Sequence, residues 1–474
     1  MTTHTLVASQ IVPVDVDRAW SFFSRPENLG RITPASMAFE MHTARPAMTE
    51  GALIDYTVRP IMGIPMPWRT RIEAIDPPIR FRDVQVRGPY KRWEHSHTLT
   101  PIAEGTRIDD RIDYELPFGP AGEIAHRMIV RRELERIFRY RARAIDSIFE
   151  PAAIGIEPRT VVVAGGSGFV GGAIARELRR RGDRVIVLSS RGEGARGSMP
   201  DDIEIRRADV REPASLAGLL DGADGLVIAL AFNNSPMENP RRGQTFMDVD
   251  AAGTENLVAA ARSAGVQRLV YLSGAGAAVD APKHWFRAKW RAEDAVRGSA
   301  IPATIIRPTW IYGPDDVSLN RFIGFARSLP VVPMTNFGRQ HLAPVFIDDV
   351  ANLAADSIRD DAATGRAFEI GGPDTLTMRE IITAAITQDD HRRPIVSGPA
   401  PLIKMAAWPL KFLPTPPLTP DAVDFINQPA TVDNAPLLDA MPRRLTPLGE
   451  GLATYLGAPE PNAKLSFEQQ GEAA

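Results

Sequence analysis

The sequence predicts an α/β protein in which a doubly wound parallel sheet follows a smaller α+β domain. The first observation is length, because 474 residues exceed what a single hydrophobic core usually organises. The second is a change of pattern near residue 150, where alternating strand-like segments give way to apolar runs separated by amphipathic helices. The third is a glycine-rich turn directly after the first of those apolar runs.

Composition excludes several classes of protein. The formal net charge is -3, with acidic and basic residues interspersed, so neither nucleic acid nor an anionic membrane is favoured as a partner. The chain has no cysteine, which excludes disulfides, thiolate nucleophiles and thiolate-bound metals. The N-terminal segment lacks a secretory signal pattern and no apolar run reaches membrane-spanning length, so we expect a cytoplasmic protein that acts on small molecules.

The N-terminal domain is predicted to contain a short helix, an antiparallel sheet and a closing helix. Strand-like alternation at 5–13 is followed by a helical segment at 17–23. Glycine or proline turns separate the next strands, which are expected at 53–58, 69–75, 81–86, 93–100 and 106–116. The period then becomes that of one long amphipathic helix over 122–149, apolar on one side and arginine-rich on the other. This order predicts a cup around an apolar cavity.

Residues 1–150 resemble the START-like (SRPBCC) superfamily of hydrophobic-ligand-binding domains. The resemblance is carried by Pro13–Trp20, Glu27–Leu29, Gly88–Tyr90 and Trp93–His97. It implies a helix-grip fold that binds a hydrophobic small molecule. Trp93, His95 and His97 alternate on one strand face, so we expect them to line the ligand cavity and contact the substrate.

Two imidazoles at positions i and i+2, His95 and His97, are also a pattern that can hold a metal ion. No third ligand is spaced nearby, so we expect cavity lining or sheet packing there and no metal site in the protein. On the 122–149 helix, acidic residues among the arginines favour a solvated or interdomain face over membrane contact.

The second domain is expected over residues 158–474, after a linker at 151–158 that has no pattern. Apolar runs typical of buried parallel strands lie at 161–164, 184–188, 226–230, 268–273 and 303–307. Helical patterns between them lie at 168–181, 245–263 and 289–296. Strands that alternate with helices predict a doubly wound sheet, and the proline-rich apolar segment beyond 399 departs from that rhythm.

The segment from Gly165 to Gly171 has the composition and context of a phosphate-binding turn. It reads Gly-Gly-Ser-Gly-Phe-Val-Gly, follows an apolar strand and opens a helix. Gly165 permits the tight bend, Gly168 lets the backbone approach a pyrophosphate, and Gly171 allows close helix packing. The pattern predicts a Rossmann dinucleotide-binding domain. The residues between these glycines are expected to contact the cofactor as well: Ser167, Phe169 and Val170.

The end of the second strand selects the dinucleotide. A carboxylate there would bind the ribose 2′-hydroxyl of NAD, but the strand ends in Ser189, Ser190 and Arg191. Hydroxyl groups and a guanidinium suit a 2′-phosphate, so we expect NADP(H), with NAD(H) as the alternative if Arg191 is only a solvated loop charge. The adenosine half is expected to meet four residues at later strand ends: Asp209, Val210, Leu230 and Ala231.

Residues 160–390 resemble the extended and atypical short-chain dehydrogenase/reductase families, of the epimerase/dehydratase type. The resemblance rests on the glycine turn and on three further blocks at 249–257, 307–314 and 344–350. It implies that Pro308 passes the nicotinamide and that the last block belongs to a substrate-side subdomain. Within these families the likeness is to the branch of the nucleotide-binding accessory subunit of respiratory complex I, through a helix without tyrosine and the segment Pro417–Val423. Relatives in that branch bind NADP(H) without obvious turnover.

The catalytic residues of these families are only partly present. The families use Tyr-x-x-x-Lys and an upstream Ser or Thr for proton transfer. Here Lys289 is in place, but the tyrosine position holds Trp285, which does not titrate and is expected to contact the substrate. Ser273 is expected near the cofactor, although the family's hydroxyl aligns with Ala275. His284 is a second candidate acid, but a histidine before a helix is more often a cap or a surface residue.

Two functions are consistent with these residues. The first is an NADP(H)-dependent reductase or isomerase whose hydrophobic substrate is gathered by the START-like domain, with Lys289 as ribose ligand or general base. The missing tyrosine favours the second, a non-catalytic protein that binds NADP(H) and carries or senses a lipid or quinone. The substrate-side block through Val350 and the fusion to a ligand-binding domain favour the enzyme, which we place first.

Overall fold

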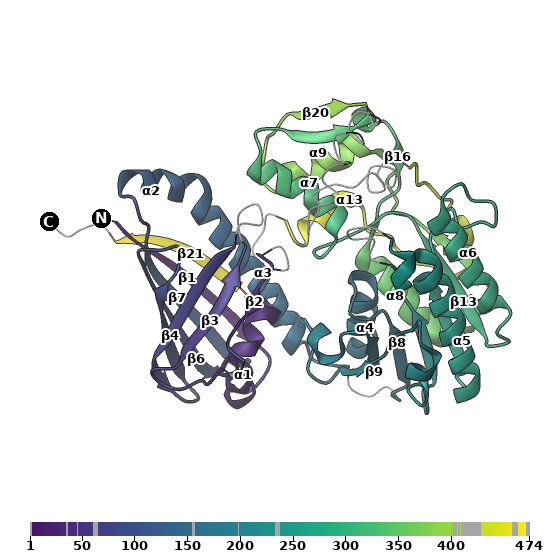
Figure 1. The fold of residues 1–474 in the computed structure, drawn as a ribbon, viewed down its shortest axis with the longest axis horizontal. Coiled ribbons are helices and arrows are strands. Elements are labelled where there is room, and N and C mark those ends of the chain that lie inside the picture. The colour runs from purple at the N-terminus through teal and green to yellow at the C-terminus, as the bar shows by residue number, and fades with distance from the viewer. Residues whose placement is uncertain are drawn as a thin grey trace. The chain divides into compact units, whose positions relative to one another are not determined.

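The computed structural model of the chain forms two compact units (Figure 1). The first contains residues 1–151, 196–201 and 459–474, and the second contains 152–195 and 202–458. Among the described residues, no helix is both long and apolar enough to cross a membrane. The structure describes residues 2–34, 37–44, 46–59, 65–153, 157–197, 199–232, 238–399, 401, 405, 408, 428–456 and 463–470. The segment Pro417–Val423 lies outside these residues.

An antiparallel sheet of eight strands, in the order β2-β3-β4-β5-β6-β7-β1-β21, forms most of the first unit. Burial alternates along β7, where every second residue from Thr106 to Tyr114 is buried, so one face of the sheet carries the core. The strands are β1 (Thr3–Val12), β2 (Glu40–Met41), β3 (Leu53–Val58), β4 (Met66–Asp76), β5 (Arg80–Arg87), β6 (Arg92–Ile102), β7 (Gly105–Glu115) and β21 (Ala463–Gln470).

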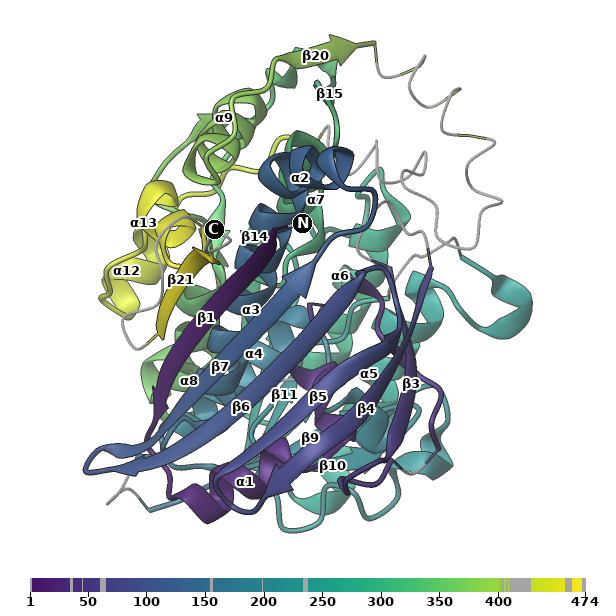
Figure 2. The same ribbon diagram turned by 90° about the vertical axis from the view of Figure 1, so that its left-hand side faces the viewer.

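Helix α3 (Arg131–Phe149) runs along the buried face of this sheet (Figure 2). Ile145 and Ile148 of α3 and Phe22 of α1 share one core with strand residues such as Leu99 and Ile108. The predicted long helix over 122–149 is present, but a π-helical turn interrupts it. The helical elements of the unit are α1 (Val16–Phe23), η1 (Pro26–Ile32), α2 (Pro120–Ala125), the π-turn η3 (His126–Val130) and α3.

The C-terminal strand corrects the predicted domain boundary. The sequence assigns all of 158–474 to the second domain, but β21 pairs antiparallel with β1, from Thr3 opposite Gln470 to Gln10 opposite Ala463. Residues 459–474 therefore belong to the first unit. A short strand pattern does not reveal its pairing partner, because that choice is made by the tertiary structure.

The second unit is a doubly wound parallel sheet, as predicted. Its seven strands follow the order β10-β9-β8-β11-β12-β13-β18, so the order reverses direction between β8 and β11, where such sheets bind ligands. Helices α5 and α6 share one core with the sheet, and α4 and α8 contact each other beside β8 and β12. The strands are β8 (Thr160–Ala164), β9 (Arg184–Ser189), β10 (Glu204–Arg207), β11 (Gly225–Ile228), β12 (Arg268–Leu272), β13 (Ala303–Pro308) and β18 (Ala367–Ile370).

The second unit also contains short strand pairs outside the main sheet and a set of helices. Two short parallel pairs, β14–β17 and β15–β20, and one antiparallel pair, β16–β19, lie outside the main sheet. The helices are α4 (Phe169–Arg180), η4 (Gly192–Ala195), η5 (Pro213–Leu216), η6 (Pro240–Arg242), η7 (Met247–Ala252), α5 (Gly253–Ala264), α6 (His284–Arg297), α7 (Val317–Ser328), η8 (Asn336–Gly338), α8 (Ile347–Arg359), η9 (Asp361–Ala363), α9 (Met378–Gln388), α12 (Ala435–Ala440) and α13 (Leu448–Ala453). The short strands are β14 (Ile311–Tyr312), β15 (Val332–Thr335), β16 (His341–Leu342), β17 (Val345–Phe346), β19 (Leu376–Thr377) and β20 (Ile395–Gly398).

The packing of α3 against its sheet predicts that Ile145→Ala destabilises the first unit by about 2–5 kcal/mol, since a fully buried side chain is replaced by a cavity. Hydrogen exchange of β6 and β7 amides, followed by mass spectrometry, would report the faster opening of this unit alone. Ile79→Ala is the control, because Ile79 is 48% exposed and should change exchange little. Equal effects of both variants would show that α3 does not hold the sheet.

Candidate functional site

The glycine turn joins β8 to α4 beside the switch point of the parallel sheet. Gly165 has φ +80°, and a Cβ there would lie 2.5 Å from the carbonyl oxygen of Ala229. A Cβ on Gly171 would lie 2.3 Å from the carbonyl oxygen of Gly165. Both positions therefore require glycine. Gly168 is the N-cap of α4 and provides no side-chain cap, which leaves the first N–H groups of the helix available to phosphate oxygens.

The other predicted residues of the turn are placed by separate contacts. The hydroxyl oxygen of Ser167 lies 3.1 Å from that of Ser189, which joins the turn to the end of β9. Phe169 and Val170 are half-buried in the first turn of α4. The Phe169 ring lies against Gly313, where a Cβ would be 3.3 Å from its Cε2 atom. The glycine turn is thus held between β9 and the substrate-side segment.

Serine hydroxyl groups and arginines gather at the ends of β9 and β10. Ser189 is buried and its hydroxyl accepts from the backbone N–H of Arg191 at 3.3 Å, whereas Ser190 and Arg191 are exposed. Within the described part of the chain, the Arg191 guanidinium has no hydrogen bond or ion pair. Arg207 at the end of β10 is the register partner of Ser189, and its Cβ lies 3.4 Å from the Cβ position of Gly192. Sequence reasoning missed Arg207, because its position opposite Ser189 is set by the pairing of β10 with β9.

Residues at the next strand ends were expected around the adenosine: Asp209, Val210, Leu230 and Ala231. Val210 and Leu230 meet at Gly253, whose Cβ position lies 2.8 Å from Val210 and 3.5 Å from Leu230. Ala231 is exposed. Asp209 pairs with Arg211 at 2.5 Å, and this hydrogen bond lowers the pKa of the Asp209 carboxyl. Asp209 is therefore already paired with a cation of its own loop.

Lys289 lies on α6 with its ammonium group surrounded by acceptors. Nζ donates to the carbonyl oxygens of Leu230 at 2.7 Å and Leu272 at 3.3 Å, and it lies 2.9 Å from Oδ1 of Asp250. Asp250 is only 1% exposed and accepts from the backbone N–H of Phe232 at 2.8 Å. These three acceptors hold the position of the Lys289 ammonium group near the ends of β11 and β12. Asp250 was missed by sequence reasoning because it comes from a separate helix.

Trp285 occupies the position where the related families have tyrosine, one helical turn before Lys289. The side chain is 8% exposed, with its ring 6.1 Å from that of Phe246 and 5.5 Å from the Lys283 ammonium. Its indole N–H is buried and has no partner among the described residues. His284 contacts Glu238 at 3.0 Å and its side chain is 38% exposed, as expected for a surface residue.

The hydroxyl group of Ser273 points to a buried ion network. Ser273 Oγ donates to Glu293 at 2.6 Å, and Glu293 is fully buried between Arg307 and Arg297. These contacts use the hydroxyl proton of Ser273, so it is not free for proton transfer. Pro308, at the end of β13, accepts from the backbone N–H of Ala275 at 2.9 Å. Strands β12 and β13 are thereby joined at their carboxyl ends.

In the first unit, the predicted ligand-contacting residues share one face of β6. Trp93 is half-buried, and His95 and His97 are buried. Asp110 of β7 lies 2.5 Å from His97 Nδ1, and Asp83 of β5 lies 3.4 Å from His97 Nε2. The expectation that no third ligand lies near the two histidines is wrong, since Asp83 is close enough to share a cation with them. The third group comes from a neighbouring strand, and the spacing of residues along β6 cannot reveal it.

Arg141 of α3 completes a buried polar network here. Its guanidinium lies 3.2 Å from Asp110 and 3.5 Å from Nδ1 of His97. Burial alone would raise the pKa of Asp110, but Arg141 and His97 hold it well below its usual range. Burial alone would lower the pKa of His97, but Asp110 raises it, whereas burial and His97 together lower the pKa of His95. The two adjacent imidazoles therefore have pKa values shifted in opposite directions within a buried polar network.

A row of aromatic rings continues from this network across the sheet. The ring of Trp93 lies 4.7 Å from Tyr90, 6.0 Å from Tyr114 and 5.3 Å from Trp68, and Trp68 stacks on Tyr56 at 5.9 Å. The indole N–H of Trp68 is buried without a partner among the described residues. Flat apolar rings with a few polar groups suit a hydrophobic ligand that carries a polar end.

Two protein families match this chain, one over each of the regions that contain these sites. Residues 3–150 match the family described as polyketide cyclase / dehydrase and lipid transport, and residues 165–360 match the family described as NAD(P)H-binding. Both matches lie in one polypeptide. The resemblance to START-like and atypical dehydrogenase domains is thereby confirmed. The glycine turn forms the first seven residues of the NAD(P)H-binding match.

Curated relatives match about half of the chain. The chain is 29% identical over 261 residues to "NADH dehydrogenase [ubiquinone] 1 alpha subcomplex subunit 9, mitochondrial" of Arabidopsis thaliana, an alignment that covers 53% of this chain and 63% of that protein. It is 26% identical over 264 residues to the "NADH-ubiquinone oxidoreductase 40 kDa subunit, mitochondrial" of Neurospora crassa, covering 53% and 68%. The chain thus spans less than two thirds of the length of the Arabidopsis relative.

A reductase and solved structures also match. The "Divinyl chlorophyllide a 8-vinyl-reductase, chloroplastic" of Zea mays is 29% identical over 234 residues, covering 45% of this chain and 55% of that protein. The Escherichia coli quinone oxidoreductase QOR2 complexed with NADPH is 18% identical, with a TM-score of 0.49, covering 62% of this chain and 99% of that one. A Bordetella bronchiseptica enzyme, WbmH, in complex with NAD+ is 19% identical, with a TM-score of 0.49, covering 63% and 96%.

The geometry of the glycine turn predicts that Gly171→Ala weakens NADPH binding about 30-fold or more, close to 2 kcal/mol, since the new Cβ would displace the Gly165 carbonyl. Isothermal titration calorimetry would measure the change. Gly324→Ala in α7 is the matched control, because a Cβ there meets nothing within 4 Å. Unchanged binding by Gly171→Ala would move the dinucleotide site elsewhere.

Proposed function

We propose that the protein binds NADP(H) in its second unit and a hydrophobic small molecule in its first, and that it acts as a nucleotide-dependent carrier or sensor. The observation that carries this proposal is the state of Lys289. Its ammonium is paired with the buried Asp250 carboxylate and donates to two carbonyl oxygens, while Trp285 replaces the tyrosine acid. In this role Lys289 holds the ammonium charge beside the nicotinamide ribose instead of moving a proton.

The preference for NADP(H) over NAD(H) rests on charge at the end of β9. Arg191 has no partner within the described residues, and Arg207 lies across the strand end from it. Two guanidinium groups and the Ser189 and Ser190 hydroxyls match the charge and the acceptors of a 2′-phosphate. No carboxylate stands at this strand end to bind a free 2′-hydroxyl.

The hydrophobic ligand of the first unit is proposed to lie against the aromatic row and to direct a polar group to the His95–His97 pair. Trp68 supplies an unpartnered buried N–H, and Trp93 supplies a half-buried ring. A lipid or quinone fits this chemistry, because each has a large apolar body and a small polar end. The description of the matching family, which includes lipid transport, agrees with such a ligand.

A reductase is the second candidate. It is favoured by the maize relative, whose name describes a vinyl reductase, and by the unpartnered indole N–H of Trp285. Reduction of a conjugated double bond needs hydride delivery from NADPH and a proton for the adjacent carbon. With no tyrosine in place, that proton would come from Lys289 or from solvent.

The proposed 2′-phosphate site predicts that Arg191→Ala weakens NADPH binding about 10–100-fold, as expected for losing a charged hydrogen bond worth about 1.5–3 kcal/mol. Binding of NADH should change less than about 2-fold, since it lacks the phosphate. Titration of both nucleotides into each variant gives the comparison, with Arg262→Ala on the exposed face of α5 as the control. An equal loss for both nucleotides would contradict a phosphate contact.

Stopped-flow oxidation of bound NADPH by a panel of quinones, enones and ketones separates the two candidate functions. We expect tight binding without turnover in the native chain, and weaker nucleotide binding in Lys289→Met, because the ammonium charge is lost. Lys91→Met, which removes an exposed ammonium from the first unit, should match the native chain. Turnover that depends on Lys289 would replace the carrier with the reductase.

A further inference from the structure

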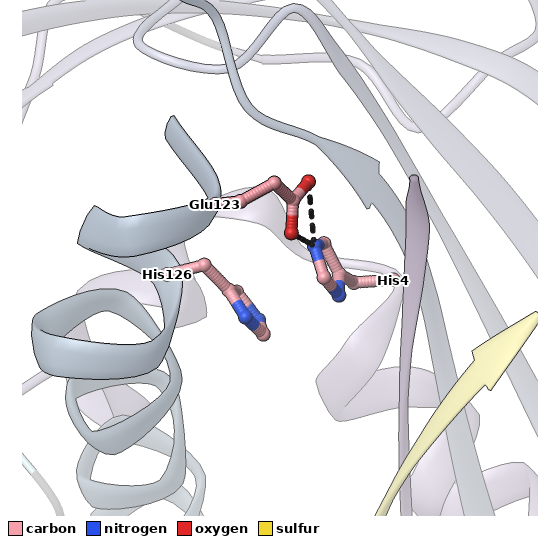
Figure 3. Close-up of side chains that lie close together, drawn as sticks. All are labelled: His4, Glu123 and His126. Carbon is pink, nitrogen blue, oxygen red and sulfur yellow. Dashed lines mark hydrogen bonds and ion pairs between the residues drawn. The ribbon is translucent and has the colours of Figure 1, made fainter. Parts of the chain in front are cut away.

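Three side chains from two distant segments of the first unit meet beside the start of β1. His4 lies on β1, Glu123 on α2, and His126 begins the π-turn η3 that follows α2 (Figure 3). Each offers a ligand atom, and these atoms all lie within 4.8 Å of one another. The two imidazoles are buried, at 1% and 4% exposure, and the Glu123 side chain is one-third exposed, at 33%. None of the three belongs to the nucleotide site or to the His95–His97 network.

We propose that His4, Glu123 and His126 form a binding site for a divalent transition metal ion of the Zn²⁺ type. Two histidines and one carboxylate are a donor set that Zn²⁺ takes in proteins, with the fourth position left to water. Glu123 provides one negative charge and reaches solvent, so it gives the ion both a counter-charge and an entry path. The proposal replaces the expectation from sequence that the protein has no metal site.

The present hydrogen bonds leave ligand capacity unused. His4 Nε2 lies 3.1 Å from a Glu123 carboxylate oxygen, and His126 Nε2 lies 2.7 Å from the Tyr114 hydroxyl. The Nδ1 atoms of His4 and His126 are buried and have no hydrogen-bond partner among the described residues. Buried polar atoms are rarely left unpaired, so two of them side by side indicate a missing partner. The Tyr114 hydroxyl also orients the His126 ring, as an outer partner does for a metal-bound imidazole.

The ring geometry shows what binding would change. The two imidazoles are stacked, with centroids 3.6 Å apart and planes 16° from parallel. Lone pairs in parallel rings do not converge on one point, so one ring must turn out of the stack to bind. The interruption of the helix at η3 places His126 on a π-turn, an irregularity that often marks functional positions.

The charges around this cluster also favour it over the second group that could hold a cation, Asp83, His95 and His97. In that group Asp110 is already paired with the Arg141 guanidinium, which also lies 3.5 Å from His97 and would repel a metal ion. Among the described ion pairs, Glu123 pairs with His4 and with no arginine or lysine. Arg131, whose charge acts on His126, is itself paired with Glu135 at 3.2 Å.

Metal titration of the full chain tests the proposal. The protein is freed of metal with a chelator and titrated with Zn²⁺ by calorimetry, and with Co²⁺ by visible absorption. We expect one equivalent to bind, and we expect His4→Ala, His126→Ala and Glu123→Ala each to weaken binding at least about 10-fold. His42→Ala is the matched control, because His42 is an exposed histidine of the same unit and should leave the affinity unchanged.

A folding check and one further variant keep the outcome clear. Glu123 is partly exposed, so Glu123→Ala is expected to fold even if a buried histidine variant does not, and circular dichroism checks this. His97→Ala should retain metal binding. No binding by the native chain, binding that survives all three ligand variants, or binding lost in His97→Ala would each overturn the site.

Discussion

The pairing of buried charges is the constraint on which both units depend. An ionised group without a partner is unfavourable to bury, and three buried carboxylates at the candidate sites each face a cation. Asp250 faces Lys289, Glu293 faces Arg307, and Asp110 faces Arg141. Each pair joins separate elements of its unit, so the pairs fix where those elements meet. The candidate sites lie at these meeting points.

The same constraint decides how the second unit can use its lysine. Contacts with Asp250 and with two carbonyl oxygens fix the position of the Lys289 ammonium group near the ends of β11 and β12. A fixed cation is well suited to holding a nucleotide and poorly suited to exchanging protons. Trp285 stands one helical turn before Lys289, at the position where the resemblance to the dehydrogenase families implies a tyrosine. The chemistry of Lys289 and Trp285, more than the fold, therefore distinguishes the carrier from the reductase.

Much of the fold was predictable, because its signals are local. The apolar runs, the amphipathic helices and the glycine turn are each written in consecutive residues, and the structure places them as expected. The Gly165 and Gly171 positions are also explained by sequence, since their spacing alone implies a tight approach of backbone to backbone. Ser189 and Arg191 could be proposed as nucleotide-binding residues because they follow directly on an apolar strand run.

What could not be predicted comes from pairing between distant segments. Arg207, Asp250 and Asp83 reach their sites from neighbouring strands or helices, and no spacing along the chain announces them. His4 and His126 are separated by more than a hundred residues, so their meeting depends on how β1 packs beside the α2–η3 junction. The error at residues 459–474 has the same origin, because β21 finds its partner only in the assembled sheet.

The pairing of β21 with β1 makes the nucleotide-binding unit an insertion within the first unit. The first strand of the chain gains its outer neighbour only from residues near the other end. During synthesis from the N-terminus, β1 therefore remains an edge strand of the sheet until β21 emerges, after the residues of the second unit. Completion of the first unit is a late step that follows synthesis of the second unit.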